Sequence, residues 1–204
     1  MSHSDERQRW DSRFGAEEYV FGTAPNAFLV SQQSLLRPGQ RALAVADGEG
    51  RNGVWLARQG LEVLSVDFSP VALAKATKLA AAAGVTLQTE CADLAAWGWG
   101  APRFDVVAAI FIQFATPQVR ESLFRGIQQA LKPGGLLLLQ GYRPEQLTYK
   151  TGGPPQADHL YTAAMLREAF ADMTILHLAE YDALIEEGVG HKGMSALIDL
   201  VARK

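Results

Sequence analysis

The sequence predicts an α/β fold: a doubly wound, mostly parallel sheet of seven strands with an antiparallel last strand. Two observations carry this prediction. From Arg41 onward, short apolar runs alternate with helix-like segments, which is the pattern of a parallel sheet covered on both faces. The last two apolar runs, 174–181 and 195–204, have no helix between them, so we expect that pair to be antiparallel.

Three strands and two helices are expected in the first half of the chain. Short apolar runs predict strands at 41–46, 61–67 and 85–92, and a helix at 52–60 is closed by Gly60. The next helix has Ser69 as its N-cap and Pro70 in its first turn, and it ends at Gly84. Serine, proline and glycine favour these three positions of a helix.

The second half continues the alternation. A strand is predicted at 103–112, an amphipathic helix at 117–131, and a fifth strand at 136–142 after the turn "KPGG". A helix at 162–170 is capped by Thr162, and the connection "DALIEEGVGHKGM" joins the final pair of strands. Residues 143–160 form a long polar connection, of the kind that makes lids or binding loops.

One domain is expected over residues 1–204, because a chain of this length, 48% hydrophobic, buries one core. Residues 41–204 form its Rossmann-like core. Residues 1–40 precede the first strand and carry an aromatic cluster before a helix at 26–36. The cluster consists of Trp10, Phe14, Tyr19 and Phe21.

The composition and charge of the chain limit the kinds of molecule that it is expected to bind. A net charge of −3 and a pI near 5.8 give no basic field for nucleic acid, so a small molecule is the expected partner. The charged first residues and the lack of a long apolar run predict no signal peptide and no membrane span, hence a cytoplasmic protein. Cys91 is the single cysteine and is expected to be buried. We predict no metal site, and a monomer or a homodimer.

The stretch "ALAVADGEGRNG" (42–53) is the main chemical signal. Gly48, Gly50 and Gly53 have the spacing of a dinucleotide-binding turn, and Asp67 follows Gly48 by 19 residues. Such a turn suits NAD and S-adenosylmethionine equally. A short-chain dehydrogenase would need a Tyr-x-x-x-Lys motif, and a two-domain dehydrogenase would need a second domain. The chain has neither the motif nor room for that domain, so an NAD(P)-dependent oxidoreductase is only the alternative.

Taken together, "ALAVADGEGRNG", "VDFSP", "CADL", "LKPGG" and the terminal antiparallel strand resemble a class I S-adenosylmethionine-dependent methyltransferase. "WDSRFGAEEYVFGTAPNAFL", "GEGRN" and "EEGVGHKG" are similar to the small bacterial tellurite-resistance (TehB-type) and thiopurine methyltransferase group. The resemblance implies S-adenosylmethionine as cofactor, S-adenosylhomocysteine as product, and a small acceptor: a chalcogen oxyanion, a thiol or another metabolite.

The resemblance also implies roles for individual residues. Gly48 and Gly50 would pack against the methionine portion and ribose, and Asp67 would bind the ribose hydroxyls. The adenine ring would contact Phe68, Asp93 and the Leu94 amide, and Ile110 would line the cofactor pocket at the end of the fourth strand. Two alternatives stay open: Asp93 is a helix N-cap, and Phe68 and Ile110 belong to the core.

One departure from the superfamily pattern concerns the first strand. The carboxylate expected two residues before the first glycine is missing, since alanines occupy the two positions concerned, Ala44 and Ala46. Asp47, Glu49 or backbone carbonyls would then meet the ammonium group of the cofactor. The same departure supports a second alternative, a non-catalytic relative that only binds the cofactor.

Candidate catalytic groups are polar residues at the ends of the later strands: Gln113, Gln140, Arg143 and His191. His191, flanked by glycines in a predicted mobile connection, contacts substrate or cofactor, or is a surface histidine. Arg143 binds an anionic substrate or is solvated. Trp10 and Tyr19 shield the sulfonium by cation-π contact, or anchor the N-terminal helix. The Asn/Asp-Pro-Pro-aromatic motif of nucleic-acid amino methylation is absent; "IFIQFA" stands in its place.

Overall fold

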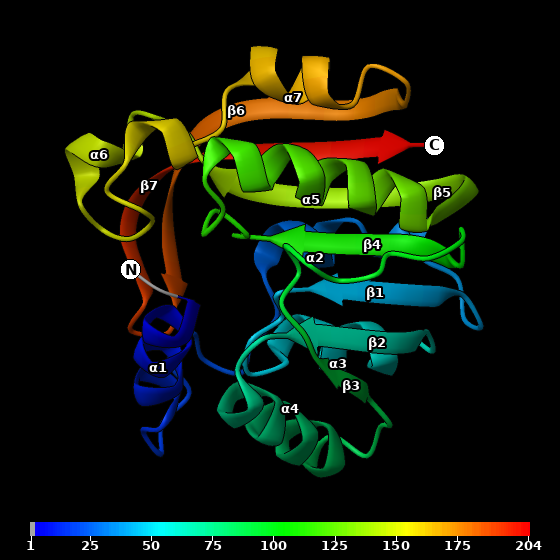
Figure 1. Ribbon diagram of the computed structural model, residues 1–204, viewed down its shortest axis with the longest axis vertical. Helices are drawn as coiled ribbons and strands as arrows, with labels where there is room; N and C mark the ends of the chain where they lie inside the picture. Colours follow the sequence, from blue (N-terminus) through cyan, green and yellow to red (C-terminus); the bar gives the residue numbers. More distant parts are fainter. Residues whose placement is uncertain (1–2) are drawn as a thin grey trace. The chain divides into compact units, whose positions relative to one another are not determined.

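The computed structural model describes residues 3–204 (Figure 1). Its strands are β1 (Arg41–Val45), β2 (Glu62–Asp67), β3 (Gln88–Cys91), β4 (Phe104–Ile110), β5 (Leu131–Tyr142), β6 (Thr174–Glu187) and β7 (His191–Arg203). Its helices are α1 (His3–Phe14), α2 (Ala27–Ser31), α3 (Arg51–Arg58), α4 (Pro70–Ala82), α5 (Pro117–Ala130), α6 (Gln146–Tyr149) and α7 (Ala163–Ala169). Short 3-10 helices lie at η1 (Gln33–Leu35) and η2 (Ala157–His159).

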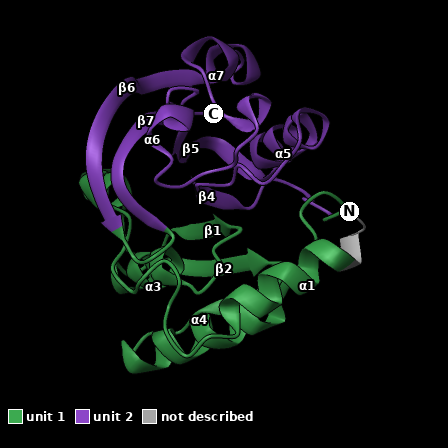
Figure 2. Ribbon diagram, turned by 90° about the vertical axis from the view of Figure 1, so that its left-hand side faces the viewer, with its two compact units in different colours: residues 1–97, 187–190 green, residues 98–186, 191–204 purple. Residues whose placement is uncertain are grey.

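The predicted fold class is confirmed. The seven strands follow the order β3-β2-β1-β4-β5-β7-β6. Strand β2 pairs parallel with β1 and with β3, β4 pairs parallel with β5, and β5 pairs antiparallel with β7. The chain divides into two compact units, residues 1–97 with 187–190 and residues 98–186 with 191–204 (Figure 2). The prediction of one domain over residues 1–204 stays a prediction.

The first unit holds the parallel strands β3, β2 and β1, with α3 and α4 packed on them and α1 packed on α4. Local sequence explains its helix boundaries. The Ser69 hydroxyl accepts a hydrogen bond from the Ala72 amide at 3.2 Å, and Pro70 opens α4 as predicted. Gly84 follows the end of α4 with φ of +68°, a conformation that glycine adopts without strain.

The second unit holds β4, β5, β6 and β7. Strand β4 is buried along almost its whole length, and α5 packs on β5. The predicted turn "KPGG" is instead an irregular part of β5. Phe104 pairs with Leu131 and Val106 with Leu136, so four residues of β5 lie opposite Asp105 alone, and three extra residues bulge out. Gly134, with φ of +80°, allows this bulge.

The structure corrects three further predictions. The connection predicted at 182–194 is mostly strand, because β6 and β7 extend until only residues 188–190 join them. The helix predicted at 26–36 is shorter, comprising α2 and η1, and α1 was not predicted at all. Cys91, expected to be buried, is exposed. The long polar connection at 143–160 contains α6 and η2.

Candidate cofactor and acceptor sites

The glycine turn after β1 is joined to the end of β2 by Asp67. This buried carboxylate accepts a hydrogen bond from the Gly48 amide at 2.9 Å with one oxygen, and from the Ser69 amide at 2.9 Å with the other. Burial raises the pKa of the Asp67 carboxyl above its ordinary value, while these amide hydrogen bonds oppose the rise. Both groups lie at the carboxyl ends of parallel strands, where α/β sheets bind ligands.

The turn itself is conformationally demanding. Gly48 and Gly50 have φ of +59° and +87°, and Ala46 has φ of +49° although it carries a Cβ. A left-handed conformation costs a non-glycine residue roughly 1–2 kcal/mol, and such residues gather at functional sites. Gly50 also has a packing reason, since a Cβ there would lie 2.5 Å from the Ala76 Cβ of α4.

Asp47 lies inside the turn and serves the fold. Its carboxylate accepts hydrogen bonds from the Ser65 hydroxyl at 2.9 Å and from the Gly53 amide at 3.2 Å. Gly53 is required here, because a Cβ would lie 2.4 Å from an Asp47 oxygen. Burial raises the Asp47 pKa to about 7, partly offset by these two hydrogen bonds. Its predicted contact with the cofactor ammonium stays a prediction.

Glu49 and Lys75 fasten the N-terminal segment to the turn. The buried Glu49 carboxylate accepts from the Val20 amide at 2.8 Å and pairs with Lys75 Nζ at 2.6 Å. The Lys75 ammonium also donates to the carbonyls of Ala16 and Glu18, at 2.9 and 2.7 Å. Residues 16–20 are therefore tied to α4 and to the glycine turn by this ion pair and its hydrogen bonds.

The aromatic cluster predicted before the first strand, which we call the aromatic cap, is partly assembled in the first unit. Trp10 stacks on Phe14 with ring centroids 5.4 Å apart, and the Phe14 ring lies 3.6 Å from the position that a Gly48 Cβ would take. Tyr19 instead lies over Lys75 Nζ at 4.8 Å and donates its hydroxyl to the Lys75 carbonyl at 3.2 Å. Trp10 also faces the Arg13 guanidinium at 5.1 Å. Phe14, not named as a site residue from the sequence, covers the glycine turn.

The other predicted adenine contacts are placed as follows. Phe68 is partly exposed directly after β2, and Asp93 is partly exposed after β3. Asp93 accepts from the Ala95 amide at 2.9 Å, as a residue that opens a turn does. Leu94 is buried, and Ile110, in the second unit, is buried at the end of β4. Their cofactor roles stay predictions.

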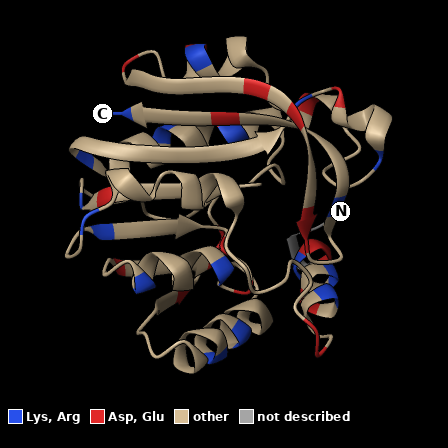
Figure 3. Ribbon diagram, turned by 180° about the vertical axis from the view of Figure 1, so that it is seen from behind, with Lys and Arg blue, Asp and Glu red and all other residues tan. Residues whose placement is uncertain are grey.

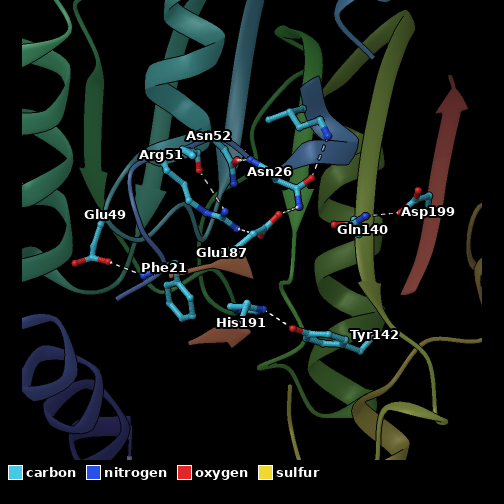
Figure 4. A network of polar contacts seen from close by, with 12 residues as sticks. Phe21, Asn26, Glu49, Arg51, Asn52, Gln140, Tyr142, Glu187, His191 and Asp199 are labelled. Carbon is cyan, nitrogen blue, oxygen red and sulfur yellow. Dashed lines mark hydrogen bonds and ion pairs between the residues drawn. The ribbon is translucent and has the colours of Figure 1, made fainter. Parts of the chain in front are cut away.

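A buried ion pair joins the tip of the β6–β7 hairpin to the glycine turn (Figure 4). Arg51 donates to Glu187 at 2.6 Å, and their side chains are 7% and 11% exposed. The Asn26 side chain donates to the same carboxylate at 2.9 Å, and the Asn26 backbone amide donates to the Asn52 side-chain oxygen at 2.9 Å. The Gly190 amide donates to the Val20 carbonyl at 3.1 Å.

In the second unit, three rings gather at the carboxyl ends of β4 and β5. Phe111 follows β4, Tyr142 ends β5, and His191 begins β7. His191 Nδ1 forms a hydrogen bond with the Tyr142 hydroxyl, visible in Figure 4. The His191 ring is parallel to that of Tyr142 and lies 4.4 Å from that of Phe111. His191, predicted in a mobile connection, is only 8% exposed within a strand.

The remaining catalytic candidates are engaged with protein groups. Gln113 is buried; its amide oxygen accepts from the Tyr142 amide at 2.5 Å, and its nitrogen donates to the Tyr142 carbonyl at 2.9 Å. Arg143 pairs with Asp182 and, at 3.3 Å, with Glu145. Gln140 donates to Asp199 at 2.7 Å. Gln113 thus positions Tyr142, and Arg143 is neutralised by two carboxylates.

Comparison with known proteins now identifies the domain. Residues 42–135, from β1 into β5 and including the glycine turn, Asp67 and Asp93, match the methyltransferase domain family. An uncharacterized methyltransferase of Synechocystis sp. is 33% identical over 105 residues, 51% of this chain and 48% of that protein. Residues 42–135 thus form a methyltransferase domain. The chain spans about half the length of that relative.

Solved structures share the fold of this methyltransferase domain along nearly the whole chain. A protein of echinomycin biosynthesis, from a study of the conversion of a disulfide bond into a thioacetal group, has a TM-score of 0.78 at 20% identity, covering 98% of this chain and 90% of its own. TehB from Haemophilus influenzae has a TM-score of 0.73 at 17% identity, and the match covers 98% of this chain and 67% of TehB. N-methyltransferase NodS from Bradyrhizobium japonicum, in complex with S-adenosyl-L-homocysteine, has a TM-score of 0.71 at 12% identity, and the match covers 97% of each chain.

Several residues that build the sites of the methyltransferase domain were missed by sequence reasoning. Lys75, Glu187, Phe111 and Tyr142 are each brought into place by a partner distant in the sequence. Arg51 and Glu187, for example, are 136 positions apart. The local signals for this pair were "GEGRN", which contains Arg51, and "EEGVGHKG", which contains Glu187, but neither indicates that the two side chains meet.

Proposed function

We propose that this chain transfers the methyl group of S-adenosylmethionine to a small-molecule acceptor. The observation that carries the proposal is the buried Asp67 carboxylate beside the glycine turn. A carboxylate offers about four acceptor positions, and the amides of Gly48 and Ser69 take one on each oxygen. The Phe68 amide also interacts with this carboxylate, and the acceptor capacity that remains suits a ribose hydroxyl, so the residues fit the cofactor.

The turn also fits the rest of the cofactor. Gly48 has no Cβ, so a ligand can approach its backbone closely, and the Phe14 ring lies against the same point. We infer that Phe14, with Trp10 stacked on it, closes this part of the site against water. Glu49 and Lys75 fix the segment that follows α1.

S-adenosylmethionine supplies a methyl group that is already activated by its sulfonium. The protein therefore has to align a nucleophile behind the methyl carbon and exclude water. In this proposal Asp67 orients the ribose and the aromatic cap excludes water.

A small acceptor agrees with the charge of the chain. Lys and Arg are spread over several elements among the described residues, with Asp and Glu between them (Figure 3), and the net charge is −3. Among residues 3–204, no helix is long and apolar enough to cross a bilayer. Of the acceptors predicted from the sequence, a chalcogen oxyanion, a thiol or another metabolite, this proposal requires only that the acceptor be small. We retain the prediction of a cytoplasmic monomer or homodimer.

Turnover separates this proposal from its alternatives. The protein is incubated with methyl-labelled S-adenosylmethionine and tellurite, selenite, thiols, phenols and amines, and labelled product is measured. We expect label in at least one acceptor and release of S-adenosylhomocysteine. Binding of S-adenosylhomocysteine without transfer to any acceptor would favour the non-catalytic relative. The alanines at 44 and 46, in place of the expected carboxylate, support that alternative. Oxidation of NADH would favour the oxidoreductase.

A further inference from the structure

We propose that His191, positioned by Tyr142, removes a proton from the methyl acceptor, so that the acceptor is a neutral phenol, alcohol or amine. The proposal rests on the proposed function and deepens it, because it names the acceptor class. It is carried by the geometry of three residues of the second unit, Phe111, Tyr142 and His191.

The Tyr142 hydroxyl fixes how the imidazole is used. His191 Nδ1 shares a hydrogen bond with this hydroxyl, a group that can donate or accept. When Nδ1–H donates to the Tyr142 oxygen, Nε2 carries the lone pair and accepts a proton. A phenol as partner supports this tautomer without placing a negative charge beside the ring.

Tyr142 is held rigidly enough to position a base. The Gln113 side chain binds both its amide and its carbonyl, and the Tyr161 amide donates to that same carbonyl at 2.9 Å. A Cβ on Gly153 would lie 2.8 Å from the Tyr142 ring, so the ring is closely packed. Catalytic groups need such locked supports.

The rings beside His191 suit the charge that it would acquire. Phe111 and Tyr142 lie with ring centroids 4.4 and 5.6 Å from that of His191. Aromatic faces attract a cation, most strongly when water is excluded. Phe111 adopts φ of +55°, an unfavourable conformation for a bulky residue and one that is typical of functional sites.

The step balances in atoms and charge. The acceptor oxygen or nitrogen attacks the methyl carbon of S-adenosylmethionine, a C–O or C–N bond forms, and the S–CH3 bond breaks with its electron pair on sulfur. The acceptor proton passes to His191 Nε2. The positive charge of the sulfonium thus ends on the imidazolium, and S-adenosylhomocysteine leaves as a neutral thioether.

The same geometry argues against an anionic acceptor. Arg143, the cation predicted to bind one, is neutralised by Asp182 and Glu145 and is 15% exposed. A chalcogen oxyanion attacks through the lone pair of its selenium or tellurium atom and does not have to lose a proton, so it would have no use for the His191–Tyr142 pair.

The test compares His191→Ala, Tyr142→Phe and the control His177→Ala, an exposed histidine of β6. Binding of S-adenosylhomocysteine is measured first by calorimetry for all four proteins. Methyl transfer is then measured to catechol, aniline, thiophenol, selenite and tellurite. We expect the wild type to methylate catechol or aniline, His191→Ala to lower kcat about 100-fold or more, and added imidazole to restore part of it.

We expect Tyr142→Phe, which keeps the ring, to lower kcat with KM unchanged, and His177→Ala to act as wild type. Transfer to thiophenol, selenite or tellurite alone would overturn the proposal, as would wild-type kcat in His191→Ala, or no transfer to any probe by a protein that binds S-adenosylhomocysteine. If no cofactor binds, the proposed function fails first. If His191→Ala does not fold, Tyr142→Phe decides: unchanged kcat overturns the proposal.

Discussion

The Asp67 carboxylate accepts a hydrogen bond from the Gly48 amide at 2.9 Å, across 19 positions of sequence. The bond joins the end of β2 to the glycine turn, so one residue both shapes the turn and offers acceptor positions beside it. The cofactor proposal therefore depends on Asp67 more than on the glycines, whose spacing is shared by several nucleotide-binding turns.

Asp67→Asn is expected to weaken S-adenosylmethionine binding by roughly 1–3 kcal/mol, because hydrogen bonds to a charged acceptor are replaced by bonds to a neutral amide. Calorimetric titration measures the change. Glu62→Gln, an exposed carboxylate on the same strand, is the control and should leave the affinity unchanged. An Asp67→Asn protein that binds with wild-type affinity would remove Asp67 from the site.

Gly50→Ala is expected to destabilise the protein more than Gly84→Ala. Both residues have positive φ, +87° and +68°, so both substitutions strain the backbone. A Cβ at Gly50 would also lie 2.5 Å from the Ala76 Cβ, while nothing lies within 4 Å of one at Gly84. We expect about 1 kcal/mol for Gly84→Ala and clearly more for Gly50→Ala by urea unfolding. Equal losses would show that packing against α4 is unimportant.

The buried carboxyl of Asp47 is expected to make stability depend on pH. Its pKa is raised from 3.8 to about 7, so between these values the folded state binds more protons than the unfolded state. The free energy of unfolding should therefore fall as pH rises from about 4 to 7 and level off above that range, with a slope of at most about 1.4 kcal/mol per pH unit.

Asp47→Asn isolates this contribution. Urea unfolding of both proteins from pH 4 to 8 should show the wild type losing stability relative to the variant as pH rises. A difference that does not change with pH, or that grows in favour of the wild type, would mean that the Asp47 pKa is ordinary.

The Arg51–Glu187 pair is expected to stabilise the attachment of the hairpin tip. Arg51→Met or Glu187→Leu alone should cost about 3 kcal/mol, because each leaves one buried charge unpaired. The double variant should be more stable than either single one. The exposed pair Arg125–Glu121 is the control, and its loss should cost less than about 1 kcal/mol. A double variant no more stable than the singles would contradict this account.

The parts of the fold set by local signals were predictable from the sequence. Ser69 and Pro70 begin α4, and Thr162 caps α7 through the Met165 amide, because caps involve residues within one helical turn. The parallel strands were recognised as short apolar runs. Gly48 and Asp67 follow the first and second of these strands, and their spacing led us to expect both at one nucleotide-like cofactor.

The β6–β7 hairpin was under-predicted for physical reasons. Residues 181–186 alternate between partly buried and exposed positions, but Leu184 occupies an exposed position, at 68%, and hides the alternation. Gly193 gave a turn signal, although it lies inside β7, where a Cβ would be 2.6 Å from Thr151. His191 therefore looked like a loop residue, and its burial against Tyr142 depends on contacts distant in sequence.

The identity of the cofactor is tested most directly by calorimetric titration of the protein with S-adenosylmethionine, S-adenosylhomocysteine and NADH. The account predicts micromolar binding of both S-adenosyl compounds, weakened together by Asp67→Asn, and no binding of NADH. Micromolar binding of NADH, with no heat from either S-adenosyl compound, would contradict it.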